Sequence, residues 1–295
     1  MKRHARRILR LKMAEEQRPP VLPESGGLSE IVQETQRLSA REILIAVCDS
    51  ARDELLRPPL GLGLSALAGG LTIGLSALAV ALMQAQFNGG SAHLLVAAIY
   101  PLGFIAVIIG RAQFFTENTL YPVVLALSER GHVRHMLWFW GLILAGNLLG
   151  ALLFSLLVID THAVPAAIRG TLAALGQHAT LGGFGHIFWS GVIGGWLMAL
   201  VAWVVSASHW TTGQVIMTWL LTFLIGLGSF VHCVATSAEI LCAVVAGVTP
   251  ASIYFAWLLP AVLGNLAGGV VIVSLLNYGQ VRGGGSWRQR APRQA

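Results

Sequence analysis

The sequence predicts an all-α membrane protein with six transmembrane helices, arranged as two inverted three-helix repeats, in which the second and fifth helices are broken. Three observations lead to this prediction. Of the 295 residues, 55% are hydrophobic and only 11% are charged, whereas about a quarter of a soluble domain is charged. Several apolar stretches reach the roughly 20 residues that cross a hydrocarbon core. Finally, short motifs recur at a nearly fixed separation.

The charged residues are concentrated at the two ends of the chain. Residues 1–27 and 281–295 carry most of the formal net charge of +6, and basic ends are typical of cytoplasmic anchoring beside anionic lipid. The N-terminal stretch lacks the apolar core of a secretory signal. A nucleic-acid partner is disfavoured, because the lipid bilayer accounts for the basic ends. Between Leu60 and Val281 the charged residues are Arg111, Glu117, Glu129, Arg130, Arg134, Asp160, Arg169 and Glu239.

Four regions follow from this pattern. We expect a basic cytoplasmic arm over 1–27, an amphipathic interfacial helix over 28–57, a six-span domain over 58–280 and a basic cytoplasmic tail over 281–295. The interfacial helix combines helically spaced apolar residues with interleaved charges. Pro58 and Pro59 end it and begin the first span.

The second and fifth predicted spans are too long for one straight crossing. Loops 85–91 and 247–253 carry no basic residue, while the loop with Arg130 and Arg134 does. The positive-inside tendency therefore predicts that both termini are cytoplasmic. The six spans are predicted at about 60–84, 92–128, 135–159, 184–206, 213–246 and 254–278.

Two pairs of motifs indicate an internal repeat. "GNLLGALLFSLLV" begins at Gly146 and "GNLAGGVVIVSLL" at Gly264, and 264 − 146 = 118. The polar interruptions at Thr116 and His232 have nearly the same separation, since 232 − 116 = 116. Three spans per half give the second half the opposite orientation. Interrupted helices at corresponding positions of such halves indicate a site near the membrane midplane.

The repeated motif itself has the spacing of a helix-packing face. Gly146 with Gly150, and Gly264 with Gly268, allow close helix approach. We expect the adjacent Asn147 and Asn265 to form hydrogen bonds across these contacts, or alternatively to line a conduction path.

Four titratable residues in or near the spans are candidates for function, because such groups are costly in hydrocarbon. His232 is either a proton relay or a neutral ring hydrogen-bonded to a backbone carbonyl. Arg111 either attracts anions or pairs with Glu117, whose own expected role is to accept backbone N–H groups of its loop. Glu239 is either functional or a protonated or helix-N-terminal carboxyl.

Aromatic residues accompany the first interruption. Tyr100, Phe104, Phe114 and Phe115 either belong to the core or form a hydrophobic constriction. The three cysteines and nine histidines show no disulfide or metal spacing, and nucleotide-binding and metalloprotease motifs are absent. We therefore expect no metal or cofactor, and no enzyme.

"YPLGFIAVIIGRAQFFTENTL", "GNLLGALLF", "GSFVHCVATSAEIL" and "GNLAGG" occur in this order, and residues 40–278 resemble the formate/nitrite transporter family. The resemblance implies an aquaporin-like six-span protomer, a homopentamer in a bacterial inner membrane, and one pore per protomer. It also implies passage of small monovalent anions such as formate or nitrite, or of their conjugate weak acids, with proton coupling in many members.

The resemblance also implies roles for particular residues. Thr116 and His232 correspond to the pore centre, and His232 to a central proton donor. Constriction residues correspond to Tyr100, Phe104 and Phe114 on the cytoplasmic side and to about Ile225 on the periplasmic side. The pore loops contain Gln113, Glu117, Asn118 and Thr236.

Several positions depart from the family pattern. Gln113 and Val231 stand where acidic residues are usual, and Thr236 replaces an asparagine. A lysine expected before the fourth span is missing, and His178 is the candidate substitute. Arg111 and His178 are therefore the predicted vestibule residues, and the substrate stays open.

Two other functions are compatible with the sequence. One is a neutral-solute pore of the aquaporin type, although Asn-Pro-Ala pairs are absent. The other is a non-conducting structural or regulatory membrane protein whose basic arm docks a partner. A proton donor between hydrophobic rings favours the weak-acid pore, because a neutral acid crosses a dry constriction far more readily than a bare anion.

Overall fold

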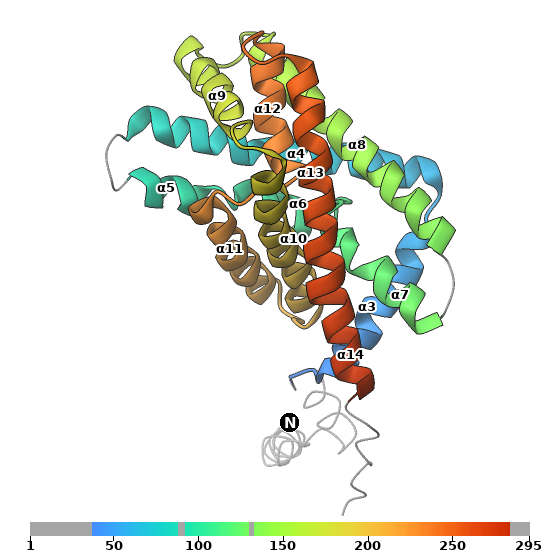
Figure 1. The fold of residues 1–295 in the computed structure, drawn as a ribbon. Helices are drawn as coiled ribbons and strands as arrows, with labels where there is room; N and C mark the ends of the chain where they lie inside the picture. Colours follow the sequence, from blue (N-terminus) through green and yellow to red (C-terminus); the bar gives the residue numbers. More distant parts are fainter. Residues whose placement is uncertain (1–36, 88–91, 130–132, 284–295) are drawn as a thin grey trace, which may run out of the picture. The chain divides into compact units, whose positions relative to one another are not determined.

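A computed structural model describes residues 37–87, 92–129 and 133–283. The predicted arm 1–27, most of the tail 281–295 and residues 28–36 of the interfacial helix lie outside these ranges. Among the described residues six helices are long and apolar enough to cross a membrane, as the sequence predicts. They are α4 (Pro59–Gln86), α5 with α6 (Ala92–Ile99, Leu102–Ile109), α8 (Val133–Ile159), α10 (Phe184–Ser206), α11 (Thr211–Gly228), and α13 with η2 and α14 (Ala251–Ala267, Gly268–Leu275, Leu276–Gly283; Figure 1).

Shorter helices complete the two broken spans and connect the halves. The second span continues, after its break, through η1 (Glu117–Thr119) and α7 (Tyr121–Glu129). The fifth continues through α12 (Ala235–Val245). The helix α9 (Ala166–Ala179) lies between the halves in sequence and packs against α12.

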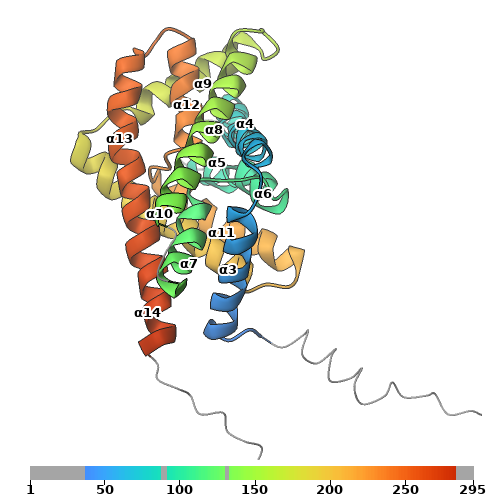
Figure 2. The same ribbon diagram turned by 90° about the vertical axis from the view of Figure 1, so that its right-hand side faces the viewer.

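The interfacial helix predicted over 28–57 is described as α3 (Ala40–Leu55). Ser39 begins it with a capping box, in which the Ser39 hydroxyl accepts from the Glu42 N–H and the Glu42 carboxylate accepts from the Ser39 N–H. The helix lies beside α7 (Figure 2). Its amphipathic pattern therefore buries one face against protein, through Ile43, Val47, Cys48 and Ala51.

Both breaks begin with the same backbone device. Arg111 (φ 57°) and Ser229 (φ 50°) are left-handed residues at the ends of α6 and α11, and a left-handed residue ends a helix by turning the chain away from its axis. The two positions correspond, because 229 − 111 = 118. The following residue in each break donates back to the last helical turn, from Ala112 to Val107 (3.0 Å) and from Phe230 to Ile225 (3.0 Å).

The irregular backbone after the first break is held by Asn147 of α8. Its Nδ2 donates to the carbonyl oxygens of Ala66 (2.7 Å) and Gln113 (2.9 Å), and its Oδ1 accepts from the Phe115 N–H (2.8 Å). Asn147 is fully buried. One side chain thus joins α8, α4 and the first broken segment.

Asn265 of α13 holds the second broken segment in the same way. Its Nδ2 donates to the carbonyl oxygens of Gly191 (2.7 Å) and Val231 (3.0 Å), and its Oδ1 accepts from the Cys233 N–H (2.8 Å). The loop partners correspond at the offset of the two asparagines, since 231 − 113 and 233 − 115 both equal 118. The predicted hydrogen bonds across the helix contacts are confirmed.

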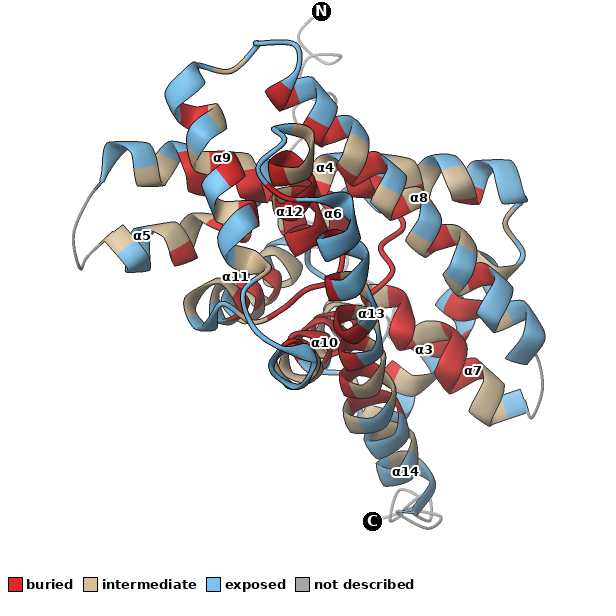
Figure 3. Ribbon diagram, turned by 45° about the horizontal axis from the view of Figure 1, so that its top comes forward, coloured by how far each residue is buried: buried red, intermediate tan, exposed pale blue. Residues whose placement is uncertain are grey.

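Glycines make these contacts possible. A Cβ atom on Gly150 would overlap the Leu67 carbonyl oxygen, and one on Gly268 would overlap that of Val192. The predicted small-residue packing faces are confirmed. Because the paired contacts recur in two halves of three spans each, the halves are inverted repeats. Buried residues, red in Figure 3, concentrate where their broken spans meet α10 and α13.

Replacing Asn147 or Asn265 by alanine should destabilise the protein. Each change removes three hydrogen bonds and leaves loop groups buried without partners, so we expect a loss of roughly 2–3 kcal/mol. In thermal unfolding of the purified protein this corresponds to a decrease in Tm of roughly 5–10 °C.

Asn277→Ala is the matched control, because within the described ranges Asn277 Nδ2 donates only to the Val273 carbonyl of its own helical segment (3.0 Å). We expect its Tm to stay within about 2 °C of the wild-type value. Equal shifts in all three variants would show that the paired asparagines have no special part in holding the broken segments.

Candidate functional site

The two broken segments meet at one hydrogen bond. Thr116 Oγ1 and His232 Nε2 are 2.7 Å apart, and both residues are fully buried. Thr116 ends the irregular part of the second span, and His232 lies in that of the fifth. The structure thus brings together the two residues that the sequence places at the centre of the repeat.

The backbone of α12 fixes the tautomer of His232. Its Nδ1 accepts hydrogen bonds from the N–H groups of Ala235 (3.0 Å) and Val234 (3.3 Å), so Nδ1 carries no proton. The remaining nitrogen, Nε2, then carries the ring proton, and this N–H donates a hydrogen bond to Thr116 Oγ1. The alternative of a backbone carbonyl as the partner of His232 is wrong, because its backbone partners are donors at the start of a helix.

Aromatic rings enclose the histidine. Phe114 stacks on the imidazole (centroids 5.1 Å apart, 13° between planes) and Phe104 meets it edge-on (5.1 Å, 88°). Tyr100 contacts Phe104 in turn (5.3 Å). Phe104 and Phe114 are fully buried, so buried aromatic side chains pack around the polar Thr116–His232 pair.

The assignment of Tyr100 and Ile225 to opposite sides of the pore is wrong. Both line one cavity of about 710 Å³, here called the vestibule, together with His178. The reason is that α5 and α11 pack side by side: Trp219 Nε1 donates to the Ala98 carbonyl (3.0 Å). Gly226 allows this approach, because a Cβ there would lie 2.9 Å from the Cβ of Tyr100.

The vestibule contains titratable groups, and none of the described residues that line it is an arginine or lysine. His178, His93 and His186 contribute to its wall, together with Glu239 and Thr236. No hydrogen bond or ion pair of the Glu239 carboxyl is found within the described ranges. Of the two residues predicted for the vestibule, His178 lines this cavity. Arg111 is exposed and does not line it.

The polar residues of the first loop form a network around its backbone. Asn118 Nδ2 donates to Gln113 Oε1 and to the Phe114 carbonyl (both 2.9 Å). The Asn118 Oδ1 atom is buried and has no hydrogen-bond partner among the described residues. From the sequence we expect Glu117 to accept from backbone N–H groups of its own loop, but its carboxylate accepts from the Tyr121 hydroxyl (3.4 Å) instead. It forms no ion pair with Arg111 in the part of the chain that is described.

Thr236, the other predicted loop residue, stabilises the second loop. Its Oγ1 accepts from the His232 N–H (3.3 Å). It also lines the vestibule, so one side chain touches both the histidine backbone and the cavity.

Two serines with a matching role were missed in the sequence. Ser65 Oγ accepts from the Gln113 N–H (3.1 Å), and Ser190 Oγ accepts from the Val231 N–H (3.0 Å). A repeated motif in the sequence contains both serines, because "SALAGG" begins at Ser65 and "SGVIGG" at Ser190. This Ser-x3-Gly-Gly repeat marks the first and fourth spans, as the Gly-Asn motif marks the third and sixth.

Known proteins share both the sequence pattern and the fold. The chain is 30% identical to "Inner membrane protein YfdC" of Escherichia coli, over 91% of this chain and 87% of that protein. It is 27% identical to "Probable formate transporter" of Methanothermobacter thermautotrophicus, over 66% of this chain and 77% of the relative.

Among solved structures, an "FNT family ion channel" has a TM-score of 0.72 at 21% identity, covering 81% of this chain and 98% of that one. A "Pentameric formate channel with formate bound" has a TM-score of 0.64 at 20% identity, covering 75% and 96%. Residues 41–279 match the family described as "Formate/nitrite transporter". Since this match spans most of the chain, the protein belongs to the formate/nitrite transporter family.

Proposed function

We propose that the protein conducts small monovalent anions or their conjugate weak acids across the membrane through the Thr116–His232 centre. The observation that carries this proposal is the buried hydrogen bond between these residues, at the junction of the two broken spans. The family match supports the transport class. The names of a relative and of a similar structure, which mention formate, support the size and charge of the substrate.

The hydrogen-bond direction at the centre favours an acceptor as substrate. Thr116 Oγ1 already accepts the hydrogen bond from His232 Nε2–H, so its own hydroxyl hydrogen is free to point elsewhere. Formate and nitrite oxygens accept hydrogen bonds, whereas Phe104 and Phe114 offer the anion no compensation for lost hydration. A donated hydrogen bond at the centre therefore lowers the barrier where the pore is driest.

Proton transfer at this centre has a defined requirement. If the Thr116 hydroxyl proton moves to the substrate, the His232 Nε2 proton can replace it on Oγ1. A ring that began neutral would then have lost its only N–H proton, which is unfavourable. Complete transfer therefore requires a second proton on Nδ1, and gaining it breaks the hydrogen bonds from Val234 and Ala235. We propose that proton-coupled passage proceeds through this rearranged state.

For the assembly and its placement, we propose a homopentamer in a bacterial inner membrane with both termini cytoplasmic. A pentameric channel of similar fold supports the assembly, the Escherichia coli relative supports the membrane, and the basic chain ends support the orientation. Native mass spectrometry of the purified protein should give the mass of five chains. A stable monomer or trimer would contradict the proposed assembly.

Removing the donor at the centre should reduce transport. In proteoliposomes loaded with formate, nitrite, acetate or lactate, we expect flux to fall roughly ten- to hundredfold in Thr116→Val, which removes the donor, and in His232→Ala, which removes the group that holds its oxygen, because a hydrogen bond to a charged group contributes about 1.5–3 kcal/mol. Flux of the wild type should rise from about pH 7.5 to about pH 5, because a larger share of each weak acid is then neutral and the neutral form crosses the apolar constriction more readily.

Thr116→Ser is the matched control, since it retains the hydroxyl and should keep flux within about threefold of wild type. Equal flux in wild type and His232→Ala would remove the histidine from the mechanism. Water flux without anion flux would favour the aquaporin-type pore, and no flux from folded protein would favour a non-conducting role.

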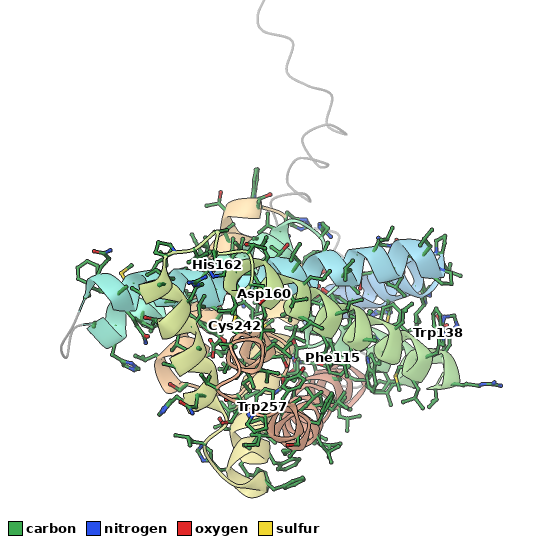
Figure 4. The ribbon with its side chains drawn as sticks, turned by 90° about the horizontal axis from the view of Figure 1, so that it is seen from above. Phe115, Trp138, Asp160, His162, Cys242 and Trp257 are labelled. Carbon is green, nitrogen blue, oxygen red and sulfur yellow. The ribbon has the colours of Figure 1, made fainter. Side chains whose placement is uncertain are left out.

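Glu239 should influence which form of the substrate enters from the vestibule. An ionised carboxylate in a concave wall repels anions and lowers their local concentration. We expect Glu239→Gln to raise anion flux at about pH 7.5 by roughly two- to fivefold. Asp160→Asn is the control with the same charge change. Asp160, labelled in Figure 4, follows the end of α8, is exposed and is not among the residues that line the vestibule. Identical fluxes in both variants would show that the Glu239 charge is irrelevant to entry.

A further inference from the structure

A second cavity, of about 780 Å³, lies away from the vestibule and shares no lining residue with it. It forms where α3 passes into α4 and where α8 begins. Its wall includes Arg57, Arg134 and His135 together with Leu55, Leu56 and Trp138. We call it the basic interfacial pocket.

The charge of this pocket is positive. The Arg134 side chain is exposed, and its guanidinium forms no hydrogen bond or ion pair within residues 37–87, 92–129 and 133–283. Arg57 uses one guanidinium nitrogen to bind Glu54 (2.9 Å), which leaves further N–H donors on the group. Among the residues that the structure describes, no aspartate or glutamate lines the pocket. The pocket thus presents unused donors to an anion.

The same pocket is apolar on its other walls. Leu56 is 80% exposed and Trp138 46% exposed, and the Trp138 ring also meets His135 edge-on (5.6 Å). Leu60, on the first turn of α4, is 75% exposed. An aqueous surface would leave this apolar area unfavourably hydrated. Cations and apolar side chains in one cavity therefore match a ligand that is itself amphipathic.

The position of the pocket along the spans adds a second indication. Pro59 and Val133 are the first residues of α4 and α8, so the pocket lies at the level where two spans enter the membrane. Tryptophan prefers this interfacial level, and basic pockets between spans bind the headgroups of anionic lipids. The open side of the pocket can receive a headgroup while acyl chains continue along the exposed leucines of α4.

We propose that the basic interfacial pocket binds an anionic glycerophospholipid. The phosphate accepts hydrogen bonds from Arg134 and Arg57, and the part of the acyl chains nearest the headgroup packs on Leu56 and Trp138. The proposal requires only that the chain spans a membrane, and does not depend on what the pore conducts. Bound lipid would tie α3 and the beginning of α4 to the beginning of α8.

The test uses purified, delipidated full-length protein. Binding of phosphatidylglycerol is measured by native mass spectrometry and by the increase in Tm on lipid addition, with phosphatidylcholine of the same acyl chains as the neutral comparison. We expect preferential binding of phosphatidylglycerol by the wild type. Arg134→Gln should weaken it about fivefold, the effect of one basic residue near an anionic lipid surface, whereas Arg134→Lys should retain most of it.

Arg41→Gln is the matched control, because Arg41 is an exposed cation on the same helix, α3, outside the pocket. An equal loss in Arg41→Gln would reduce the effect to general surface charge and overturn the proposal. Stabilisation by inorganic phosphate alone, as large as that by phosphatidylglycerol, would identify a free-anion site instead. Crosslinking of a Trp138→Cys variant to a neighbouring protomer, without bound lipid, would show that a second copy fills the pocket.

Discussion

The structure depends on how it satisfies backbone groups where two helices stop inside the membrane. Hydrocarbon supplies no hydrogen-bond partners, so broken helices persist only where protein groups replace them. Asn147 and Asn265 do this with three hydrogen bonds each. Each side-chain amide donates to two carbonyl oxygens and accepts from one N–H, which matches the donor and acceptor capacity of asparagine. The repeated Gly-Asn motif therefore determines where the chain is able to leave the helical path.

The site follows from this constraint. Because each asparagine fixes one broken segment against two full spans, the segments from the two halves meet at the contact between the repeats. Thr116 and His232 become neighbours although 116 residues separate them in sequence. The start of α12 then supplies the N–H groups that orient the imidazole. Fold and chemistry therefore share the same interruptions.

Features that repeat along the chain could be predicted from its sequence, whereas features set by packing between helices could not. The six spans, both breaks and the two asparagines followed from hydrophobic length and a fixed offset. The side on which Tyr100 lies did not, because it depends on how α5 packs beside α11. The partner of Glu117 was likewise missed, since the Tyr121 hydroxyl competes with the loop backbone. Ser65 and Ser190 repeat visibly, yet a single shared serine is a weak signal in so glycine-rich a chain.

In the proposed function, selectivity is divided between two places with different chemistry. Among the described residues, Glu239 and three histidines line the vestibule and no arginine or lysine does, so it concentrates anions poorly when the carboxylate is ionised. The centre, by contrast, holds the Thr116 hydroxyl, whose hydrogen is not used by His232, beside aromatic rings. On this proposal a weak acid meets both conditions, because its neutral form would enter past Glu239 and its oxygen would accept the Thr116 hydrogen bond. A strong-acid anion of the same size would meet only the second, so we expect the two places together to discriminate by acidity as well as by size.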